Sequence, residues 1–314
     1  MDIKKEIRRF LLDYLKNSEW DSETCNLISS LLHGEGKIFH EPALFTWGEF
    51  SFYISSVFCE DAAVHDEQAA CAATVELLIL ATDIIDELAD GDMESPVLSK
   101  LTPQRTLTLS SMLLMESLYL ILKYSAADRL GKLSCVIRNL RTASIGQWRD
   151  LSFRITENVP SERDYFSLIE QKSVSLLRLV FEVNAIENVP AWENIARYIG
   201  FSGQLRNDAA DILRDAKSDL TNRKATLPLI KAVEFSKQKD NGWLFDQLKL
   251  LGTSRDGSRL RQDIRDYIKK TGAIDYCLIL SKVYLNRAVQ LIKNCGETQR
   301  DKTRIQQLID YLEG

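Results

Sequence analysis

Residues 75–90 read VELLILATDIIDELAD, an apolar run that becomes acidic over its last two turns. Four acidic residues at positions i, i+3, i+4 and i+7 share one face if the run is helical: Asp83, Asp86, Glu87 and Asp90. Like charges at these spacings repel by about 0.2–0.5 kcal/mol per pair, and the C-terminal end of a helix disfavours carboxylates. A bound cation explains this face better than a solvated helix end does. We therefore predict a metal site on a helix over 69–89.

A second acidic face follows about 120 residues later. Asp208, Asp211 and Asp215 are spaced i, i+3 and i+7, and Gln204 and Asn207 lie beside them. Alone, this pattern is as consistent with surface charge as with a site. With the first face it suits Mg²⁺, which binds oxygen ligands from one or two carboxylates and from substrate phosphate. We expect the two faces to meet across an apolar cavity and to hold a diphosphate through two or three Mg²⁺ ions.

Helical periodicity dominates the remaining sequence, and no window of alternating polarity is long enough to predict a sheet. Only 6 prolines and 14 glycines interrupt 314 residues, which favours long helices. We predict one all-α domain over 1–314. Its expected helices are 3–15, one including 26–32, 69–89, 104–127, 133–156, 161–186, 192–215, 227–235, 243–251, 258–271, 273–293 and 302–312.

Composition excludes several classes of function. The net charge is −5 and no basic block is present, which argues against nucleic acid and anionic membranes as partners. The 6 cysteines form no CxxC pair, as expected of reduced thiols in the cytoplasm. The 3 histidines all lie early, against a histidine-rich metal site or a Ser-His-Asp triad. The apolar run 75–85 is too short for a stable membrane span, and the N-terminus lacks a signal-peptide core.

Both acidic stretches resemble the aspartate-rich motifs of trans-isoprenyl diphosphate synthases: Asp86-Glu87-Leu88-Ala89-Asp90 and Gln204-Leu205-Arg206-Asn207-Asp208-Ala209-Ala210-Asp211. Further motifs of that family occur in its order: Gly36-Lys37, Gly146-Gln147-Trp148-Arg149-Asp150, Tyr165 followed by Lys172-Ser173, and Lys224-Ala225-Thr226-Leu227-Pro228. The resemblance spans about residues 36–295. It implies the all-α isoprenoid synthase fold, a helical bundle around a central cavity, commonly as a homodimer.

The resemblance also implies roles for individual residues. The metal ligands would be Asp86, Asp90, Asn207, Asp208 and Asp211, of which the four aspartates are catalytic. Asn207 stands where an aspartate is usual, and its amide oxygen would coordinate with less charge. The diphosphate-binding residues would be Lys37, Lys172, Lys224 and either Arg214 or Lys217, although plain surface lysines are the alternative. Supporting positions behind these ligands would be Glu87, Gln147, Asp150 and Gln204.

The departures from the family pattern fall on the half-site for isopentenyl diphosphate. His40 stands where an arginine is expected, and Ile79 replaces a histidine or glutamine. No arginine or lysine occurs between Asp90 and Ser99. Each lost contact from a charged group would remove about 1.5–3 kcal/mol. The run 76–86, with its additional Asp83, is similar to that of ComQ-type isoprenyltransferases, bacterial enzymes that prenylate a tryptophan of a pheromone precursor.

This resemblance implies a Mg²⁺-dependent transfer of a geranyl or farnesyl group from an allylic diphosphate to a tryptophan of a quorum-sensing pheromone precursor peptide. The diphosphate would leave with the help of metal ions and lysines, and the indole C3 would attack the allylic cation. Small Ala81 and Thr82 would leave room for the prenyl tail, unless they are ordinary packing positions. The alternatives are a chain-elongating synthase that uses isopentenyl diphosphate, a non-catalytic subunit of such a synthase and, more distantly, a terpene cyclase.

Overall fold

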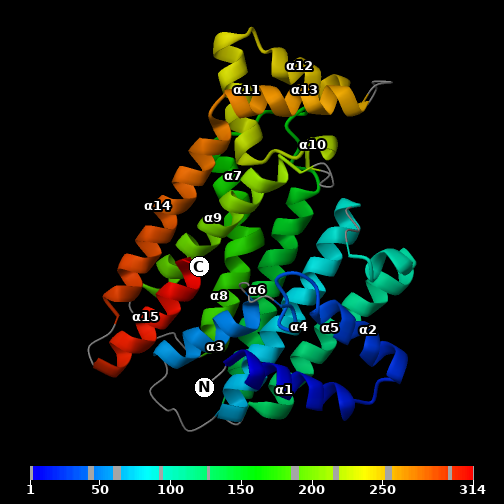
Figure 1. The fold of residues 1–314 in the computed structure, drawn as a ribbon, viewed down its shortest axis with the longest axis vertical. Helices are drawn as coiled ribbons and strands as arrows, with labels where there is room; N and C mark the ends of the chain where they lie inside the picture. Colours follow the sequence, from blue (N-terminus) through cyan, green and yellow to red (C-terminus); the bar gives the residue numbers. More distant parts are fainter. Residues whose placement is uncertain are drawn as a thin grey trace. The chain divides into compact units, whose positions relative to one another are not determined.

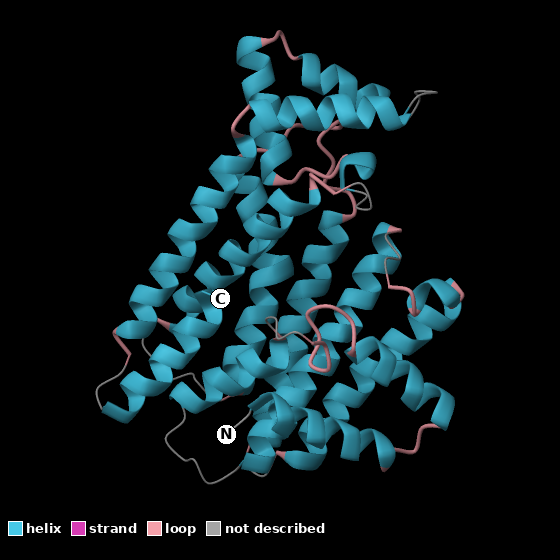
Figure 2. Ribbon diagram, in the orientation of Figure 1, coloured by secondary structure: helices cyan, strands magenta, loops and turns pink. Residues whose placement is uncertain are grey.

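The computed structural model describes residues 3–41, 46–58, 65–91, 95–125, 128–184, 191–214, 219–251, 257–295 and 299–313. Within these residues the chain is helical and forms no strand (Figure 2). The all-α prediction is therefore confirmed. The elements, labelled in Figure 1, are α1 Ile3–Lys16, α2 Ser22–Leu32, α3 Trp47–Phe58, α4 His65–Asp90, η1 Leu98–Lys100, α5 Pro103–Tyr124, α6 Arg129–Asp150, α7 Glu162–Ile169, η2 Glu170–Val174, α8 Ser175–Val183, α9 Trp192–Asp211, α10 Asp219–Asn222, α11 Leu227–Lys239, α12 Trp243–Leu250, α13 Gly257–Lys270, α14 Ala273–Lys293 and α15 Gln299–Glu313.

The structure differs from the predicted helices at two instructive places. The predicted helix 133–156 ends at Asp150, because the next residues pair with a distant segment. The amide of Ala225 donates to the carbonyl of Phe153 at 2.8 Å, and the amide of Ile155 donates to the carbonyl of Arg223 at 2.9 Å. Helix α3 was not predicted, since its sequence WGEFSFYISSVF is rich in aromatic residues with modest helix propensity.

The contacts divide the chain into two compact units. Unit 1 comprises Met1–Asn139, Arg178–Trp192 and Leu291–Gly314, and unit 2 comprises Leu140–Leu177 and Glu193–Gln290. We describe each unit by itself. The expectation of one domain over 1–314 stays a prediction.

Helix α4 forms the centre of unit 1. It packs against α1, α3 and α5, and its residues 69–81 are buried without interruption. An apolar helix covered on several sides is stabilised mainly by this burial. The burial fixes the rotation of α4 and therefore fixes which way its acidic C-terminal turns point.

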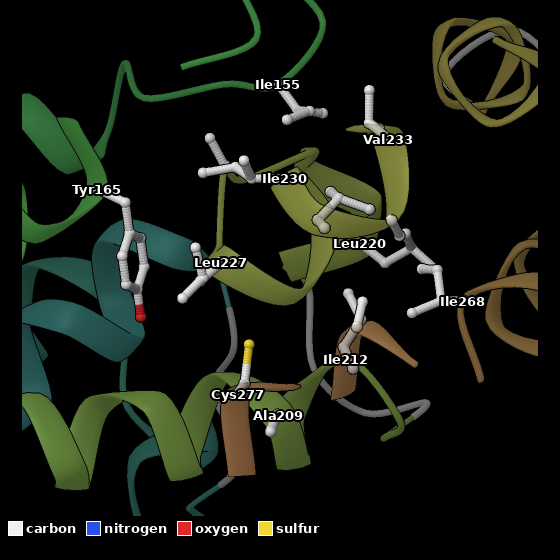
Figure 3. Packing of buried hydrophobic residues seen from close by; sticks show 14 of the residues in the cluster. Ile155, Tyr165, Ala209, Ile212, Leu220, Leu227, Ile230, Val233, Ile268 and Cys277 are labelled. Atoms are coloured by element: carbon white, nitrogen blue, oxygen red, sulfur yellow. The ribbon is translucent and has the colours of Figure 1, made fainter. Parts of the chain in front are cut away.

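The core of unit 2 is formed by apolar side chains from α7, α9, α11, α13 and α14 (Figure 3). Tyr165 enters it from α7, Ala209 from α9 and Leu227 from α11, while Ile268 comes from α13 and Cys277 from α14 beside Ala209. The second acidic motif lies on α9, so its backbone is anchored by this core.

Within the described part of the chain, two helices are long and apolar enough, by length and composition, to cross a membrane. The window in α4 is 78% buried inside the protein, whereas the window in α5 is 39% buried. The burial of α4 is that of a core helix. The partial exposure of α5 is considered below together with its apolar surface.

Candidate functional site

The acidic face of unit 1 lies on the last two turns of α4. Asp83, Asp86, Glu87 and Asp90 are all half-buried, whereas Ile84 between them is buried in the core. The predicted sharing of one helical face is thus realised, and the face borders solvent. Its donor atoms are carboxylate oxygens, the ligand type that Mg²⁺ prefers.

Lys37 binds one member of this face. Its Nζ donates to Oδ2 of Asp83, so Asp83 is engaged in an ion pair. The loop that carries Lys37 is compact, because the amide of Phe39 donates to the carbonyl of Leu32 at 2.8 Å and Gly36 adopts a φ of 73°. That positive φ suits glycine, which has no Cβ to clash.

A buried glutamate, Glu76, stands behind this ion pair, and sequence reasoning missed its role. Its side chain is 1% exposed and accepts the amide of Ile38 at 2.9 Å and that of Gly48 at 2.8 Å. Burial raises the pKa of the Glu76 carboxyl, against the opposing effects of Lys37 and the two amides. Burial also acts to lower the pKa of Lys37, but Asp83 and Glu76 outweigh it, and that pKa is raised. The sequence did offer a signal for this role, because Glu76 is the one acidic residue within the apolar run 75–81.

Unit 2 gathers the lysines of two separate motifs around one carboxylate. Lys172 Nζ donates to Oδ2 of Asp150 at 2.7 Å, and Lys224 Nζ lies 3.6 Å from the same oxygen. Lys224 also lies 3.7 Å from Oδ1 of Asp219. The structure thus brings together Asp150, Lys172 and Lys224, and it adds Asp219; the roles of the two lysines in diphosphate binding stay predictions.

The Lys224 segment also presents an unsatisfied hydroxyl. Oγ1 of Thr226 is buried and has no hydrogen-bond partner among the residues that the structure describes. Although Thr226 is the N-cap of α11, its side chain makes no capping bond. A buried polar atom without a partner is costly, and a phosphate oxygen of a ligand would satisfy it.

Asp208 of the second motif points into unit 2. Its carboxylate accepts the Tyr165 hydroxyl at 2.7 Å on Oδ2 and the Gln204 side-chain amide at 2.7 Å on Oδ1. Ser173 completes the chain by donating to Oε1 of Gln204 at 2.7 Å. Burial raises the pKa of Asp208 to about 7, although the bonds from Tyr165 and Gln204 act to lower it. This geometry assigns Asp208 to holding α9 against α7, and its role as a metal ligand stays a prediction.

The other residues of the second motif lie nearer the surface. Asn207 is exposed and Asp211 is half-buried at the end of α9. Arg214 Nη1 approaches Oδ1 of Asp211 to 3.8 Å, so Arg214 is placed beside the acidic motif rather than beside the two lysines. Lys217, the alternative to Arg214, and Asp215 lie outside the described residues.

Gly146 explains how Lys172 is positioned. A Cβ built on Gly146 would lie 2.7 Å from both the backbone carbon of Gln171 and Cα of Lys172, and closer still to the Lys172 nitrogen. Helix α6 therefore touches the backbone of η2, a π-helical segment, directly. Such segments often occur at functional sites. Gln147 follows on α6 and is half-buried.

Among the residues that the structure describes, no three His, Cys, Asp or Glu side chains converge in a geometry that would hold a metal ion. The chemistry of the donor set nevertheless fits Mg²⁺. Asp86, Glu87 and Asp90 offer only oxygen atoms, and their mutual repulsion on one helix face would be relieved by a divalent cation.

The sequence pattern of the polyprenyl synthetase family matches residues 48–264. A short chain isoprenyl diphosphate synthase of Methanothermobacter thermautotrophicus is 24% identical over 250 residues, which covers 74% of this chain and 75% of that protein. The tryptophan prenyltransferase ComQ of Bacillus subtilis is 23% identical over 256 residues, which covers 79% of this chain and 83% of that protein. A polyprenyl synthase structure from Caulobacter crescentus, in complex with calcium and isoprenyl diphosphate, has a TM-score of 0.77 at 18% identity and covers 98% of this chain and 93% of its own.

Proposed function

Because the chain belongs to the polyprenyl synthetase family, and is therefore a prenyltransferase, we propose that it transfers a geranyl or farnesyl group from an allylic diphosphate to a tryptophan of a pheromone precursor peptide. The observation that carries this proposal is the loss of basic character on the acceptor side. Ile79 stands where a histidine or glutamine is expected, and its side chain is 1% exposed in the core of unit 1. The His40 ring lies 3.2 Å from the His33 carbonyl through Nδ1.

The proposed donor side keeps its polar residues. Lys172, Lys224 and the Thr226 hydroxyl would bind the oxygens of the leaving diphosphate. Asp86 and Asp90, with Asn207 and Asp211 of the second motif, would ligate magnesium. When bound, Mg²⁺ would neutralise negative charge that develops on the leaving diphosphate. The calcium and isoprenyl diphosphate in the Caulobacter crescentus structure support a divalent cation with this ligand class.

The acceptor chemistry follows from charge. When the bond between C1 of the prenyl group and the diphosphate oxygen breaks, its electron pair leaves with the diphosphate. An indole ring carries no charge to be repelled by Asp83 or Glu76, and its π electrons favour a nearby cation. Attack by indole C3 then forms the new carbon–carbon bond and moves the positive charge to the ring nitrogen, whose proton passes to the diphosphate that has left. The similarity to ComQ of Bacillus subtilis over 79% of this chain supports such an acceptor.

Chain elongation with isopentenyl diphosphate is the second candidate. The similarity to the short chain isoprenyl diphosphate synthase, over 74% of this chain, favours it. The two functions differ in the product, because elongation needs no peptide. Lys37 would have to bind isopentenyl diphosphate in elongation and has no such role in peptide prenylation.

The test is a competition between the two acceptors. The protein is incubated with Mg²⁺, geranyl or farnesyl diphosphate, isopentenyl diphosphate and a tryptophan-containing precursor peptide, and the products are weighed by mass spectrometry. We expect a peptide heavier by one prenyl group and little lengthened diphosphate. Asp86→Ala should abolish turnover while the protein stays folded, and a phenylalanine in place of the acceptor tryptophan should abolish peptide labelling. Efficient elongation with an unmodified peptide would refute the proposal.

We also propose that the protein is a homodimer that uses an exposed apolar stripe. Four large apolar residues on α5 are exposed at spacings that place them on one side of the helix: Leu107, Met115, Tyr119 and Leu122. Leu130 and Ile137 of α6 are also exposed in unit 1. Large apolar residues exposed along one side of a helix are typical of an interaction site. It also gives a reason for the partial exposure of α5 that requires no membrane.

We place the protein in the cytoplasm. Five cysteines in the described part of the chain are free thiols: Cys25, Cys71, Cys135, Cys277 and Cys295. Reduced thiols are typical of that compartment.

A further inference from the structure

The backbone that follows Lys37 is anchored at two points. The amide of its neighbour Ile38 donates to buried Glu76 at 2.9 Å. Nζ of Lys4 donates to the carbonyl of His40 at 2.8 Å, and Arg8 donates to the same carbonyl at 3.0 Å. Because the backbone just after Lys37 is tied to the buried Glu76 and to α1, the Lys37 side chain starts from a fixed place beside α4.

The ammonium group of Lys37 forms an ion pair with the carboxylate of Asp83. The Lys37 side chain is 16% exposed and that of Asp83 is 48% exposed, so the contact is reachable from solvent on the Asp83 side. Asp83 lies one turn before Asp86 on the acidic face of α4. It therefore places a carboxylate at the point where a diphosphate oxygen would otherwise meet Lys37.

The charges around Lys37 add to the same effect. Asp83 and Glu76 surround one lysine with two carboxyl groups. The neighbouring cations are already engaged, since Lys4 binds a carbonyl and Arg8 binds carbonyls and Glu41 at 2.7 Å. A diphosphate that entered here would have to displace Asp83 and would then lie beside an unpaired carboxylate in a partly buried site, where such repulsion is poorly screened.

We propose that Asp83 is a specificity-determining residue, which excludes isopentenyl diphosphate from the acceptor side by binding Lys37 in its place. This inference rests on the proposed function and gives a structural reason why isopentenyl diphosphate is not the acceptor. An acceptor without charge, such as an indole side chain, meets no penalty from the Lys37–Asp83 pair. The same prenyltransferase scaffold is thereby directed away from elongation by one carboxylate.

The test compares Asp83→Asn with a matched variant of the same helix. Glu67 of α4 pairs with Lys132 at 2.9 Å, in a more buried setting than Asp83, so Glu67→Gln makes an equal charge change away from Lys37. Binding of isopentenyl diphosphate is measured by calorimetry with Mg²⁺, after the donor site is saturated with an unreactive thiolo analogue of farnesyl diphosphate. We expect Asp83→Asn to tighten the Kd about tenfold or more. Glu67→Gln should leave it within about twofold of wild type.

A third variant tests whether the tighter binding of isopentenyl diphosphate depends on Lys37. Lys37→Met added to Asp83→Asn should return the Kd to the wild-type value or weaker, because the ammonium group is then missing. Asp83→Ser serves as a second substitution if the asparagine variant does not fold, as checked by its circular dichroism melting curve. An unchanged Kd in both Asp83 variants, an equal gain in Glu67→Gln, or a gain that survives Lys37→Met would each overturn the inference.

The result of the Asp83 experiment can be distinguished from the result of the test of the proposed function. Peptide prenylation is read by mass in the wild-type protein, whereas the role of Asp83 is read as diphosphate affinity. If no peptide product forms but Asp83→Asn tightens binding through Lys37, the peptide acceptor is wrong and the exclusion stands. If peptide product forms but Asp83→Asn changes nothing, the function stands and Asp83 is not its cause.

Discussion

Gly146→Ala is expected to damage the protein although it adds a single methyl group to a helix. Helix α6 touches the π-helical segment η2 at this glycine, and the added Cβ would lie 2.7 Å from two backbone atoms, of Gln171 and Lys172. Ordinary carbon contacts are about 3.5–4.0 Å. Because the obstructing atoms belong to backbone, no side-chain rotation relieves the clash, and α6 and η2 must separate by roughly 1 Å.

The expected magnitude combines two opposing effects. Alanine in place of glycine within a helix contributes about 0.5–1 kcal/mol of stability. Overpacking costs about 1–3 kcal/mol, so we expect a net destabilisation of roughly 1–2 kcal/mol. The effect on turnover should be larger. A shift of about 1 Å moves Lys172 away from Asp150, and misplacement on this scale can reduce catalysis about a hundredfold.

The chain offers a matched control in Gly203, a helical glycine of α9 whose added Cβ would meet nothing within 4 Å. Urea denaturation should show Gly146→Ala less stable and Gly203→Ala equal to or more stable than wild type. Turnover of allylic diphosphate should fall about a hundredfold in Gly146→Ala alone. Wild-type stability and turnover in Gly146→Ala would refute the argument that this glycine exists for close approach to Lys172.

Three further predictions concern unit stability, pH and assembly. Arg265 is buried and donates to the carbonyls of the two residues 212 and 214 at 3.3 and 3.1 Å, just beyond α9. Arg265→Met should therefore cost about 2–5 kcal/mol in urea denaturation, and a loss below about 1 kcal/mol would contradict this. Burial raises the pKa of Asp208 to about 7. Without divalent cations, the stability that Asp208 contributes should therefore be fully present below about pH 4 and be lost as the pH rises through 7. The free energy of unfolding should fall by at most about 1.4 kcal/mol per pH unit over this range. Asp208→Asn should remove this dependence, and an unchanged slope would exclude Asp208 as its origin. Met115→Glu should convert dimers to monomers in sedimentation, whereas Leu12→Glu, at another exposed apolar position, should not; monomeric wild-type protein would refute the dimer.

The sequence predicted the helices well because their cores are long and strongly periodic. Helix α4 was expected over 69–89 and spans 65–90. The errors occur where tertiary contacts override local preference. Residues after Asp150 have helical periodicity but pair with the segment around Lys224, and no local pattern could reveal a partner about seventy residues away.

The candidate site was predicted as a set of residues but not as a set of contacts. The resemblance to a known family singled out Lys172, Lys224 and Asp150 but did not show that both lysines lie at this one carboxylate. The engagement of Asp208 by Tyr165 could not be read from sequence, since the spacing of Asn207, Asp208 and Asp211 shows only that they are neighbours on a helix. Which of them turns inward depends on how α9 rotates against its core.

The two units differ in how many carboxylates surround each lysine, and this difference bears on acceptor choice. In unit 2, Lys172 and Lys224 share Asp150, at 2.7 and 3.6 Å. Lys224 also lies 3.7 Å from Oδ1 of Asp219, so two ammonium groups face two carboxylates in this cluster. In unit 1, Lys37 pairs with Asp83 and has the buried carboxyl of Glu76 beside it, so one ammonium group faces two carboxyl groups. A lysine therefore predicts diphosphate binding only when its carboxylate partners are counted with it. By that count, the proposed donor side opposes a diphosphate less than the proposed acceptor side does, and removing Asp83 gives the two sides the same ratio of carboxyl to ammonium groups.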